Sequence, residues 1–162
     1  MSQLMLGAHM SIAGGVSKAL DRGASVGSNA VQVFTKNNRQ WQGPPIDEAD
    51  VARWATEMPA AGIEYAVSHA SYLINLASPN PELWDRSYRS FRKELARCSA
   101  LQLSFLVTHP GNATDGDRES GIHRNADGVT RALEEVQGPT RVLLELTAGS
   151  GTSVGGSFED LA

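Results

Sequence analysis

The chain has 162 residues, 41% of them hydrophobic, and a formal net charge of −4. That length suits one ordinary domain with an apolar core, and no run approaches the ~20 apolar residues that a membrane span needs. An acidic chain does not favour a nucleic-acid partner, because phosphate binding usually leaves a basic footprint. Bound divalent metals and a few local Lys and Arg residues can nevertheless reverse the sign of a cleft.

The start of the chain shows no basic segment followed by an apolar one, so no secretory signal is visible. The single cysteine, Cys98, excludes an internal disulfide and fits a reducing compartment. We therefore expect a cytoplasmic protein without a membrane segment.

In the first half of the chain, short apolar runs alternate with segments of helical periodicity. Strands are expected at 4–8 and 30–34, with a polar loop at 35–41 after the second. Asp47 is expected to cap a helix. The inner helix faces predicted from spacing are Val16, Ala19, Leu20 and Ala24 for the first helix, and Val51, Trp54, Ala55 and Met58 for the second.

The second half repeats the alternation. Strands are expected at 65–69, 105–108 and 142–145. Asn80-Pro81 is a strong helix start, a capping side chain followed by a proline whose missing N–H costs nothing there. The predicted inner faces are Trp84, Tyr88, Phe91, Leu95 and Cys98 for the third helix, and Ile122, Ala126, Val129, Leu133 and Val136 for the fourth.

Four strand–helix units followed by a fifth strand imply parallel pairing and right-handed crossovers. We predict an α/β fold of the TIM (β/α)8-barrel type, present as an incomplete barrel of about five strands, since a full barrel has eight. Ser157 and Asp160 have the spacing of a capping box, which opens a helix. The sequence ends at Ala162, so we interpret residues 1–162 as a single partial barrel domain, truncated at the start of a helix.

Four apolar runs each finish on a metal-type ligand: His9, His69, His109 and Glu145. The C-terminal strand ends of a parallel barrel converge on one face, where catalysis takes place. Two imidazoles and a carboxylate, from His69, His109 and Glu145, suit zinc and leave room for a water whose pKa the metal would lower. The alternative is that the three are isolated polar residues at strand ends. This alternative is less favoured, because the strand ends of a barrel converge on one face.

Two histidines fall outside that set. His9 shares the face and is either a group supporting the metal site, a phosphate contact, or a strand-end histidine bonded to backbone. His123 sits at the start of a predicted helix and is expected on the surface.

Two strand-end loops carry residue types that could meet DNA. Lys36, Arg39 and Trp41 lie in the loop at 35–41, where cationic and amide groups beside an indole could contact a nucleic-acid backbone and bases. Tyr72 and Leu73 follow the His69 strand, and apolar wedges of this kind can enter a base stack. From composition alone, a solvated loop and ordinary packing are the better interpretations.

Several segments together resemble the endonuclease IV family of apurinic/apyrimidinic endonucleases. The matches run from end to end of the chain, in order and at family spacing. They are Gly7-Ala8-His9, Phe34-Thr35-Lys36-Asn37 through Arg39-Gln40-Trp41, His69-Ala70-Ser71-Tyr72-Leu73-Ile74-Asn75-Leu76, Thr108-His109-Pro110-Gly111, and Glu145 followed by Thr147-Ala148-Gly149.

The resemblance implies a TIM barrel with three zinc ions that cleaves double-stranded DNA 5′ to abasic sites and leaves a 3′-hydroxyl. By position, His69 and His109 resemble ligands of one zinc, and Glu145 the catalytic carboxylate bridging it to a second. Arg39, Tyr72 and Leu73 resemble the residues that enter the duplex at the lesion. Metal-bound hydroxide would attack the phosphorus, and the complete protein is expected to be a monomer.

The sequence departs from the family at two positions beside Glu145, with Leu146 where asparagine is common and Ser150 where glutamine is common. The family's remaining ligands lie on later strands, so ligands for only a partial cluster are present here. The isolated chain is therefore expected to be inactive or nearly so. Alternatives are a metal-dependent sugar isomerase or epimerase of similar barrel fold, and an inactive fragment.

Overall fold

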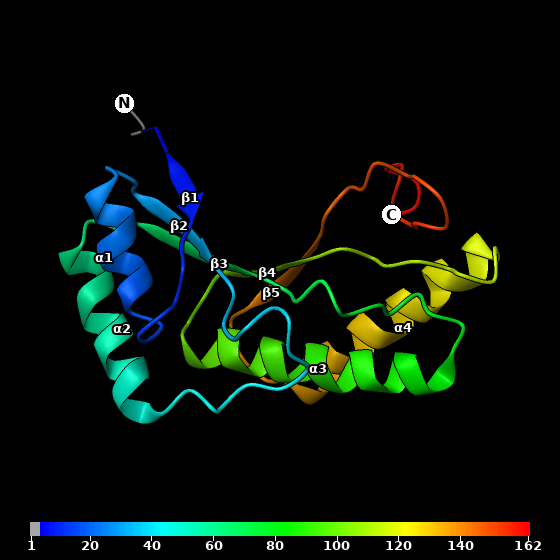
Figure 1. The fold of residues 1–162 in the computed structure, drawn as a ribbon, viewed down its shortest axis with the longest axis horizontal. Helices are drawn as coiled ribbons and strands as arrows, with labels where there is room; N and C mark the ends of the chain where they lie inside the picture. The colour runs from blue at the N-terminus through cyan, green and yellow to red at the C-terminus, as the bar shows by residue number, and fades with distance from the viewer. Residues whose placement is uncertain (1–3) are drawn as a thin grey trace.

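The computed structural model describes residues 4–162. Five strands form one parallel sheet in sequence order, and a helix follows each of the first four (Figure 1). The elements are β1 (Gly7–His9), α1 (Lys18–Ser25), β2 (Ala30–Val33), α2 (Glu48–Ala60), β3 (Tyr65–His69), α3 (Pro81–Ala100), β4 (Phe105–Thr108), α4 (Arg118–Glu135) and β5 (Arg141–Leu144). The expected strand–helix alternation and parallel pairing are confirmed.

The sheet has one covered face and one open face. Side chains that alternate along the strands toward the helices, such as Val31, Val33 and Leu106, are at most 2% exposed. Tyr65 and Leu143, on the opposite row, are 52% and 43% exposed. Figure 1 shows all four helices on one side of the strands. Within residues 4–162 the other face, which a closed barrel turns inward, is left open.

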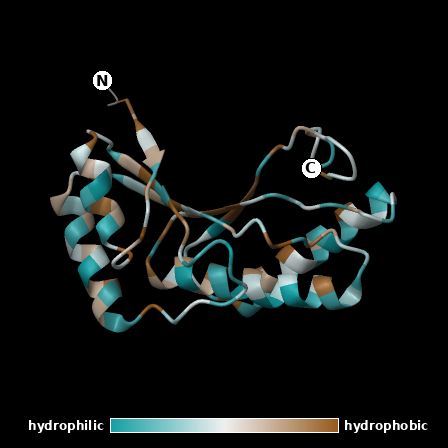
Figure 2. Ribbon diagram, viewed as in Figure 1, coloured by the Kyte–Doolittle hydropathy of each residue, from teal (hydrophilic) through white to brown (hydrophobic). Residues whose placement is uncertain are grey.

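Helix α3 is the longest element and packs the core beneath the sheet. The Asn80 side chain accepts a hydrogen bond from the Leu83 amide at 2.9 Å, and Pro81 opens the helix, as predicted. The predicted inner face is confirmed: Phe91 and Leu95 are fully buried. Each such side chain contributes about 1.5–3 kcal/mol on burial. In Figure 2 the strands carry much of the hydrophobic colouring and the helices much of the hydrophilic.

The first two helices bury a narrower face than predicted. Ala24 and Ala55 are exposed, so their assignment to the core is wrong. In α1 the contact is made by Gly23, where a Cβ would lie 2.5 Å from the Val31 side chain. In α2 Trp54 is 2% exposed, and Asp47 caps the helix as predicted by accepting from the Asp50 amide at 2.7 Å.

The prediction for α4 is wrong at Ala126 and Leu133, which are exposed. The buried residues of this helix are Gly121, Asn125, Gly128 and Ala132. Small residues are required because α4 lies close to its neighbours: a Cβ at Gly128 would come within 3.1 Å of Leu76. The apolar periodicity of the sequence pointed to the larger side chains of α4. The residues that face the core are instead small, because the α4 backbone lies close to its neighbours.

The end of the chain does not form the helix that the capping box predicts; residues 157–161 form turns. The Asp160 carboxylate accepts from the amides of Gly155 and Gly156, both at 2.9 Å, and pairs with Arg118. The carboxylate therefore stabilises the preceding turn. Among the helices of the described chain, none is long and apolar enough to cross a membrane.

Candidate metal centre at the strand ends

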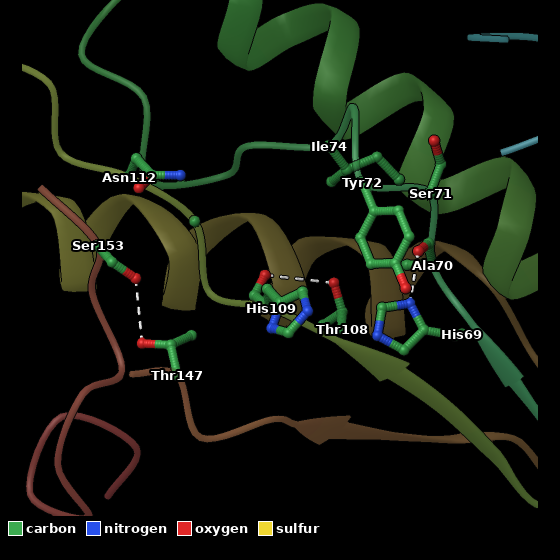
Figure 3. Close-up of a pocket in the computed structure, with 11 residues that line it drawn as sticks. His69, Ala70, Ser71, Tyr72, Ile74, Thr108, His109, Asn112, Thr147 and Ser153 are labelled. Atoms are coloured by element: carbon green, nitrogen blue, oxygen red, sulfur yellow. Dashed lines mark hydrogen bonds between the residues drawn. The ribbon is translucent and has the colours of Figure 1, made fainter. Parts of the chain in front are cut away.

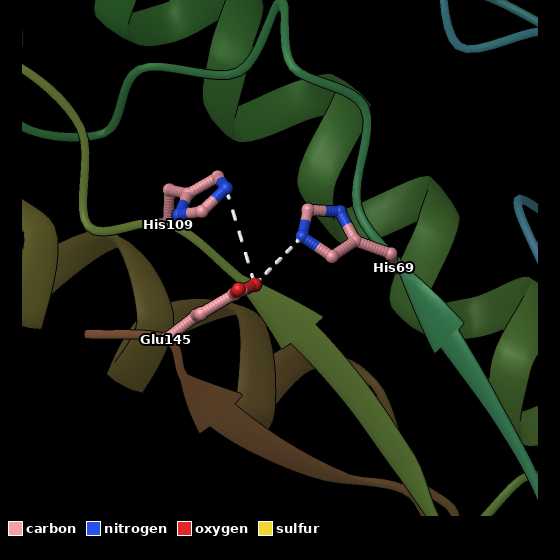
Figure 4. A group of neighbouring side chains, drawn as sticks. All are labelled: His69, His109 and Glu145. Atoms are coloured by element: carbon pink, nitrogen blue, oxygen red, sulfur yellow. Dashed lines mark hydrogen bonds and ion pairs between the residues drawn. The ribbon is translucent and has the colours of Figure 1, made fainter. Parts of the chain in front are cut away.

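Three neighbouring strands each deliver one ligand-type side chain to the same point. His69 is the last residue of β3, His109 follows β4 directly, and Glu145 follows β5 directly. One donor atom from each lies within 4.8 Å of the others (Figure 4). The structure thus brings together the three residues that the sequence singled out, as convergence of parallel strand ends requires. Their role as metal ligands stays a prediction.

His69 is held in a defined orientation. Its Nδ1 lies 2.7 Å from the Ala70 carbonyl oxygen, which can only accept, so Nδ1 donates. Its Nε2 lies 3.0 Å from Glu145 Oε2. In a neutral ring that donates from Nδ1, Nε2 carries a lone pair, and a lone pair facing a carboxylate is unfavourable. A cation bound between the two groups would satisfy both the lone pair and the carboxylate.

His109 faces the same carboxylate oxygen from further away. Its Nε2 lies 3.9 Å from Glu145 Oε2. Its buried Nδ1 has no hydrogen-bond partner among the described residues. Glu145 is 46% exposed, so the carboxylate is open to solvent. His69 and His109 line a cavity of about 160 Å³ that also reaches Thr147 and Ser153 (Figure 3). Donor chemistry and access both fit a divalent cation.

An aromatic residue absent from the predicted site, Phe34, connects His9 to the cluster. The Phe34 ring centroid lies 4.4 Å from His9, 5.9 Å from His69 and 5.6 Å from Tyr72. Partial burial lowers the pKa of His9; a hydrogen bond with the Gln32 side chain opposes this shift, and the charge of His69 adds to it. His9 therefore lies beside the site without joining the three-residue group, and its support of a metal or a phosphate stays a prediction.

The residues expected to read DNA differ in exposure, and Tyr72 is the one of them that lines this cavity among the described residues. Arg39 is exposed. Tyr72 is 64% exposed, with its ring 5.2 Å from His69 and stacked on His109 at 6.0 Å. Leu73 is half-buried. Lys36 is different: it is 5% exposed and bonded inside the protein, so it is unavailable to a phosphate. The view of the whole 35–41 loop as solvated is wrong at this residue.

The Asn75 side chain joins the loop after β3 to the loop after β4 by two hydrogen bonds. Apart from the place of Asn75 in the family motif, no sequence pattern indicates this role. Its Oδ1 accepts from the Asn112 amide at 2.9 Å, and its Nδ2 donates to the Asn112 carbonyl at 3.0 Å. Gly111 adopts φ +112°, and a Cβ there would lie 2.3 Å from Asn75 Oδ1. Glycine after His109-Pro110 is thus required by close approach as well as by backbone conformation.

The two departures from the family pattern lie at the surface. Leu146 is 44% exposed and follows Glu145 directly. Ser150 is exposed, and its carbonyl accepts from the Ser153 amide at 3.2 Å. Neither side chain hydrogen-bonds to Glu145 in the described residues. Their effect on the carboxylate stays a prediction.

The fold and the site together define the class of protein. Residues 20–162 match the family model of the xylose isomerase-like TIM barrel, so the chain belongs to that family. The predicted TIM-barrel fold class is confirmed.

Proteins named probable endonuclease 4 are similar to this chain. A probable endonuclease 4 of Chloroflexus aurantiacus is 50% identical over 157 residues, 96% of this chain and 55% of the relative. One from Geobacter sulfurreducens is 46% identical over 97% of this chain and 53% of the relative. The resemblance stated from the motifs is confirmed. The chain spans about half the length of the curated relatives it matches, and its interpretation as a partial domain stays a prediction.

Solved structures give the same result. Endonuclease IV of Thermus thermophilus superposes with a TM-score of 0.83 at 35% identity, covering 96% of this chain and 56% of that one. A D-psicose 3-epimerase superposes with a TM-score of 0.61 at 12% identity, covering 88% of this chain and 52% of that one. The second likeness shows the barrel fold alone.

Proposed function

We propose that this chain supplies the lesion-reading loops and part of the metal centre of a DNA repair endonuclease, which cleaves duplex DNA 5′ to abasic sites and leaves a 3′-hydroxyl. The observation that carries the proposal is the convergence of His69, His109 and Glu145 beside an exposed tyrosine. The similarity to endonuclease IV proteins supports it.

The donor set suits zinc, and three ions are expected in the complete protein. His69, oriented by the Ala70 carbonyl, His109 and the half-exposed Glu145 would hold the metal. When bound, such ions supply Lewis acidity and a water acidic enough to serve as nucleophile near neutral pH. The chain's own contribution is to fix these ligands at one point and to keep the carboxylate open toward a phosphate.

The loops would recognise the lesion by shape. Tyr72 stands exposed over the two histidines, and the half-buried Leu73 follows it. An aromatic and an aliphatic side chain can fill the gap that a missing base leaves in the stack. Arg39 would contact the phosphate backbone from the neighbouring loop. We further propose that the complete enzyme is a monomer acting in the cytoplasm.

The test is nicking of a duplex that carries one abasic site by the protein expressed from the complete gene. We expect cleavage that chelation abolishes and that His109→Ala reduces by at least about 100-fold, the scale seen when a group that stabilises the transition state is lost. His123→Ala, an exposed histidine on α4, is the matched control and should cut normally. Chelator-insensitive cutting would contradict the proposal.

A sugar isomerase or epimerase is the alternative that shares the fold and the His and Glu residues. The loops that carry Arg39 and Tyr72 discriminate between the two functions, because binding a small sugar does not require side chains that enter a base stack. Gel shifts with abasic DNA should weaken in Tyr72→Ala and in Arg39→Ala. Sugar turnover that neither substitution affects, together with no DNA binding, would favour the isomerase.

A further inference from the structure

A buried ion pair lies beneath the loops of the site. Lys36 Nζ is 2.9 Å from Glu94 Oε1, and the two side chains are 3% and 2% exposed. Lys36 Nζ also donates to the Gln40 carbonyl at 2.6 Å. Lys36 belongs to the segment 35–41, here called the Arg39 loop, and Glu94 to helix α3. One contact of Glu94 thus reaches the Arg39 loop from within the core.

The second carboxylate oxygen of Glu94 reaches the other loop. Glu94 Oε2 accepts from the Ser71 amide at 3.0 Å, next to Tyr72 in the segment 70–73, here called the Tyr72 loop. The Ser71 hydroxyl in turn donates to the Asn38 carbonyl at 2.7 Å, in the Arg39 loop. One buried carboxylate therefore contacts both loops, and the loops also contact each other.

Two more residues on the same face of α3 complete the attachment. One turn before Glu94, Ser90 Oγ donates to the Trp41 carbonyl at 3.1 Å. Just under one turn after it, Arg97 donates from Nε and from Nη2 to the Thr35 carbonyl, at 3.2 and 2.7 Å, and from Nη1 to the Pro44 carbonyl. Residues spaced by three and four share one helix face. This face holds the Arg39 loop from one end to the other.

We infer that Glu94 is a positioning residue for DNA recognition, which fixes the Arg39 and Tyr72 loops relative to each other before the substrate arrives. The inference rests on the proposed function. A buried ion pair is weak evidence for stability, because apolar residues of similar volume are often equally stable or more so. An ion pair does fix geometry, and a preorganised binding surface gains affinity because less order is lost on binding.

Two double variants separate geometry from stability. Lys36→Met with Glu94→Leu removes both charges and the acceptor for the Ser71 amide while keeping the volume. Lys36→Met with Glu94→Gln also removes both charges but keeps a side-chain oxygen that can accept from that amide. Lys18→Met with Asp21→Leu removes an exposed pair on α1, 3.1 Å apart and 49% and 60% exposed, as the matched control.

The first measurement needs no DNA. Amide hydrogen exchange of Ser71 and of the Arg39 loop should speed up in the Leu variant, remain closer to wild type at Ser71 in the Gln variant, and stay unchanged in the control. Exchange in β3 and β4 should be the same in all. Unchanged exchange in the Leu variant would overturn the inference.

The second measurement, on the protein from the complete gene, is the ratio of dissociation constants for intact and abasic duplex. We expect the Leu variant to lose roughly tenfold of that preference, as for a binding surface that is no longer preorganised, and the Gln variant to recover part of it. Zinc binding should be unaffected. A preference retained in full by the Leu variant overturns the positioning role alone, whereas a wild-type protein without any preference overturns the proposed function.

Discussion

Two base–acid clusters contact the same short segment, residues 69–71, and they are built in opposite ways. Lys36 and Glu94 are almost fully buried, and carbonyl, hydroxyl and amide groups of the protein surround them. His69 and Glu145 are the same distance apart, within 0.1 Å, yet Glu145 is 46% exposed. Beside them His109 Nδ1 lacks a partner in the described residues.

The difference in burial indicates that the two clusters have different roles. The polar atoms of Lys36 and Glu94 form hydrogen bonds inside the protein, so they are not available to bind a ligand. Their hydrogen bonds hold the backbone of the two loops in place. Two imidazoles and a solvent-open carboxylate within reach of one point can bind a cation together. The Lys36–Glu94 cluster, here called the closed cluster, should therefore govern loop geometry. The cluster of His69, His109 and Glu145, here called the open cluster, should govern metal binding.

The largest effect is expected when one member of the closed cluster is removed. Glu94→Ala leaves the Lys36 ammonium buried and unpaired, which costs about 3–5 kcal/mol of unfolding free energy. Glu145→Ala in metal-free protein removes a half-exposed partner and should cost only about 0–1 kcal/mol. Urea unfolding measures both. Equal losses would show that the two clusters are not distinct in kind.

Metal addition should stabilise the protein through the open cluster only. Zinc at 100 times its dissociation constant should raise the unfolding free energy of the wild type by about 2.7 kcal/mol. His69→Ala and Glu145→Ala should lose this gain, because each removes a donor, while His123→Ala should keep it. Thermal unfolding with and without zinc is the measurement. A gain that survives in Glu145→Ala would place the ion elsewhere.

A smaller loss is expected from a capping residue of the helix that carries Glu94. Asn80→Ala removes the acceptor for the Leu83 amide and should cost about 1 kcal/mol. Since no hydrogen bond in the described part of the chain joins Asn80 to either loop of the site, exchange of the Ser71 amide should not change. Asp47→Ala, the equivalent cap of α2, is the control for lost stability. Faster exchange at Ser71 in Asn80→Ala would show that general weakening of the protein, and not Glu94, governs that loop.

The open cluster could be found from sequence, and the closed one could not. Each ligand-type residue ends an apolar run, and parallel strands bring such ends together by topology alone, so His69, His109 and Glu145 were identifiable. Lys36 and Glu94 form a pair only because α3 packs under the loop after β2. A lysine in a polar loop and a glutamate on a helix are typical of solvated surfaces, and no local pattern marks them as buried.

Helix faces show the same limit. The stripe on α3 was predictable because its large apolar residues also face the core. On α4 the predicted Leu133 is 41% exposed and Gly128 is buried. Periodicity finds large side chains, and it does not register a contact for which a small residue is needed because the backbones lie close together.

The smallest effect is expected at an ion pair with one exposed partner, Arg118 at 47%, beside Asp160 at 11%, which sharpens the contrast with the fully buried Lys36–Glu94. The pKa of Asp160 is held below its ordinary value of 3.8, chiefly by the hydrogen bond from Arg118 and also by the amides of Gly156 and Gly155. A carboxylate with a depressed folded-state pKa contributes stability above its unfolded-state value, and the contribution disappears as the pH falls through the folded-state value. Asp160→Asn should therefore lower stability slightly at neutral pH, and the difference from wild type should vanish in acid.

High salt should shrink the Arg118 part of this difference, because exposed charges are screened, whereas the loss caused by Glu94→Ala should hardly respond. A salt-independent effect at Asp160 would show that its bonds to the glycine amides, and not the ion pair, hold the turn.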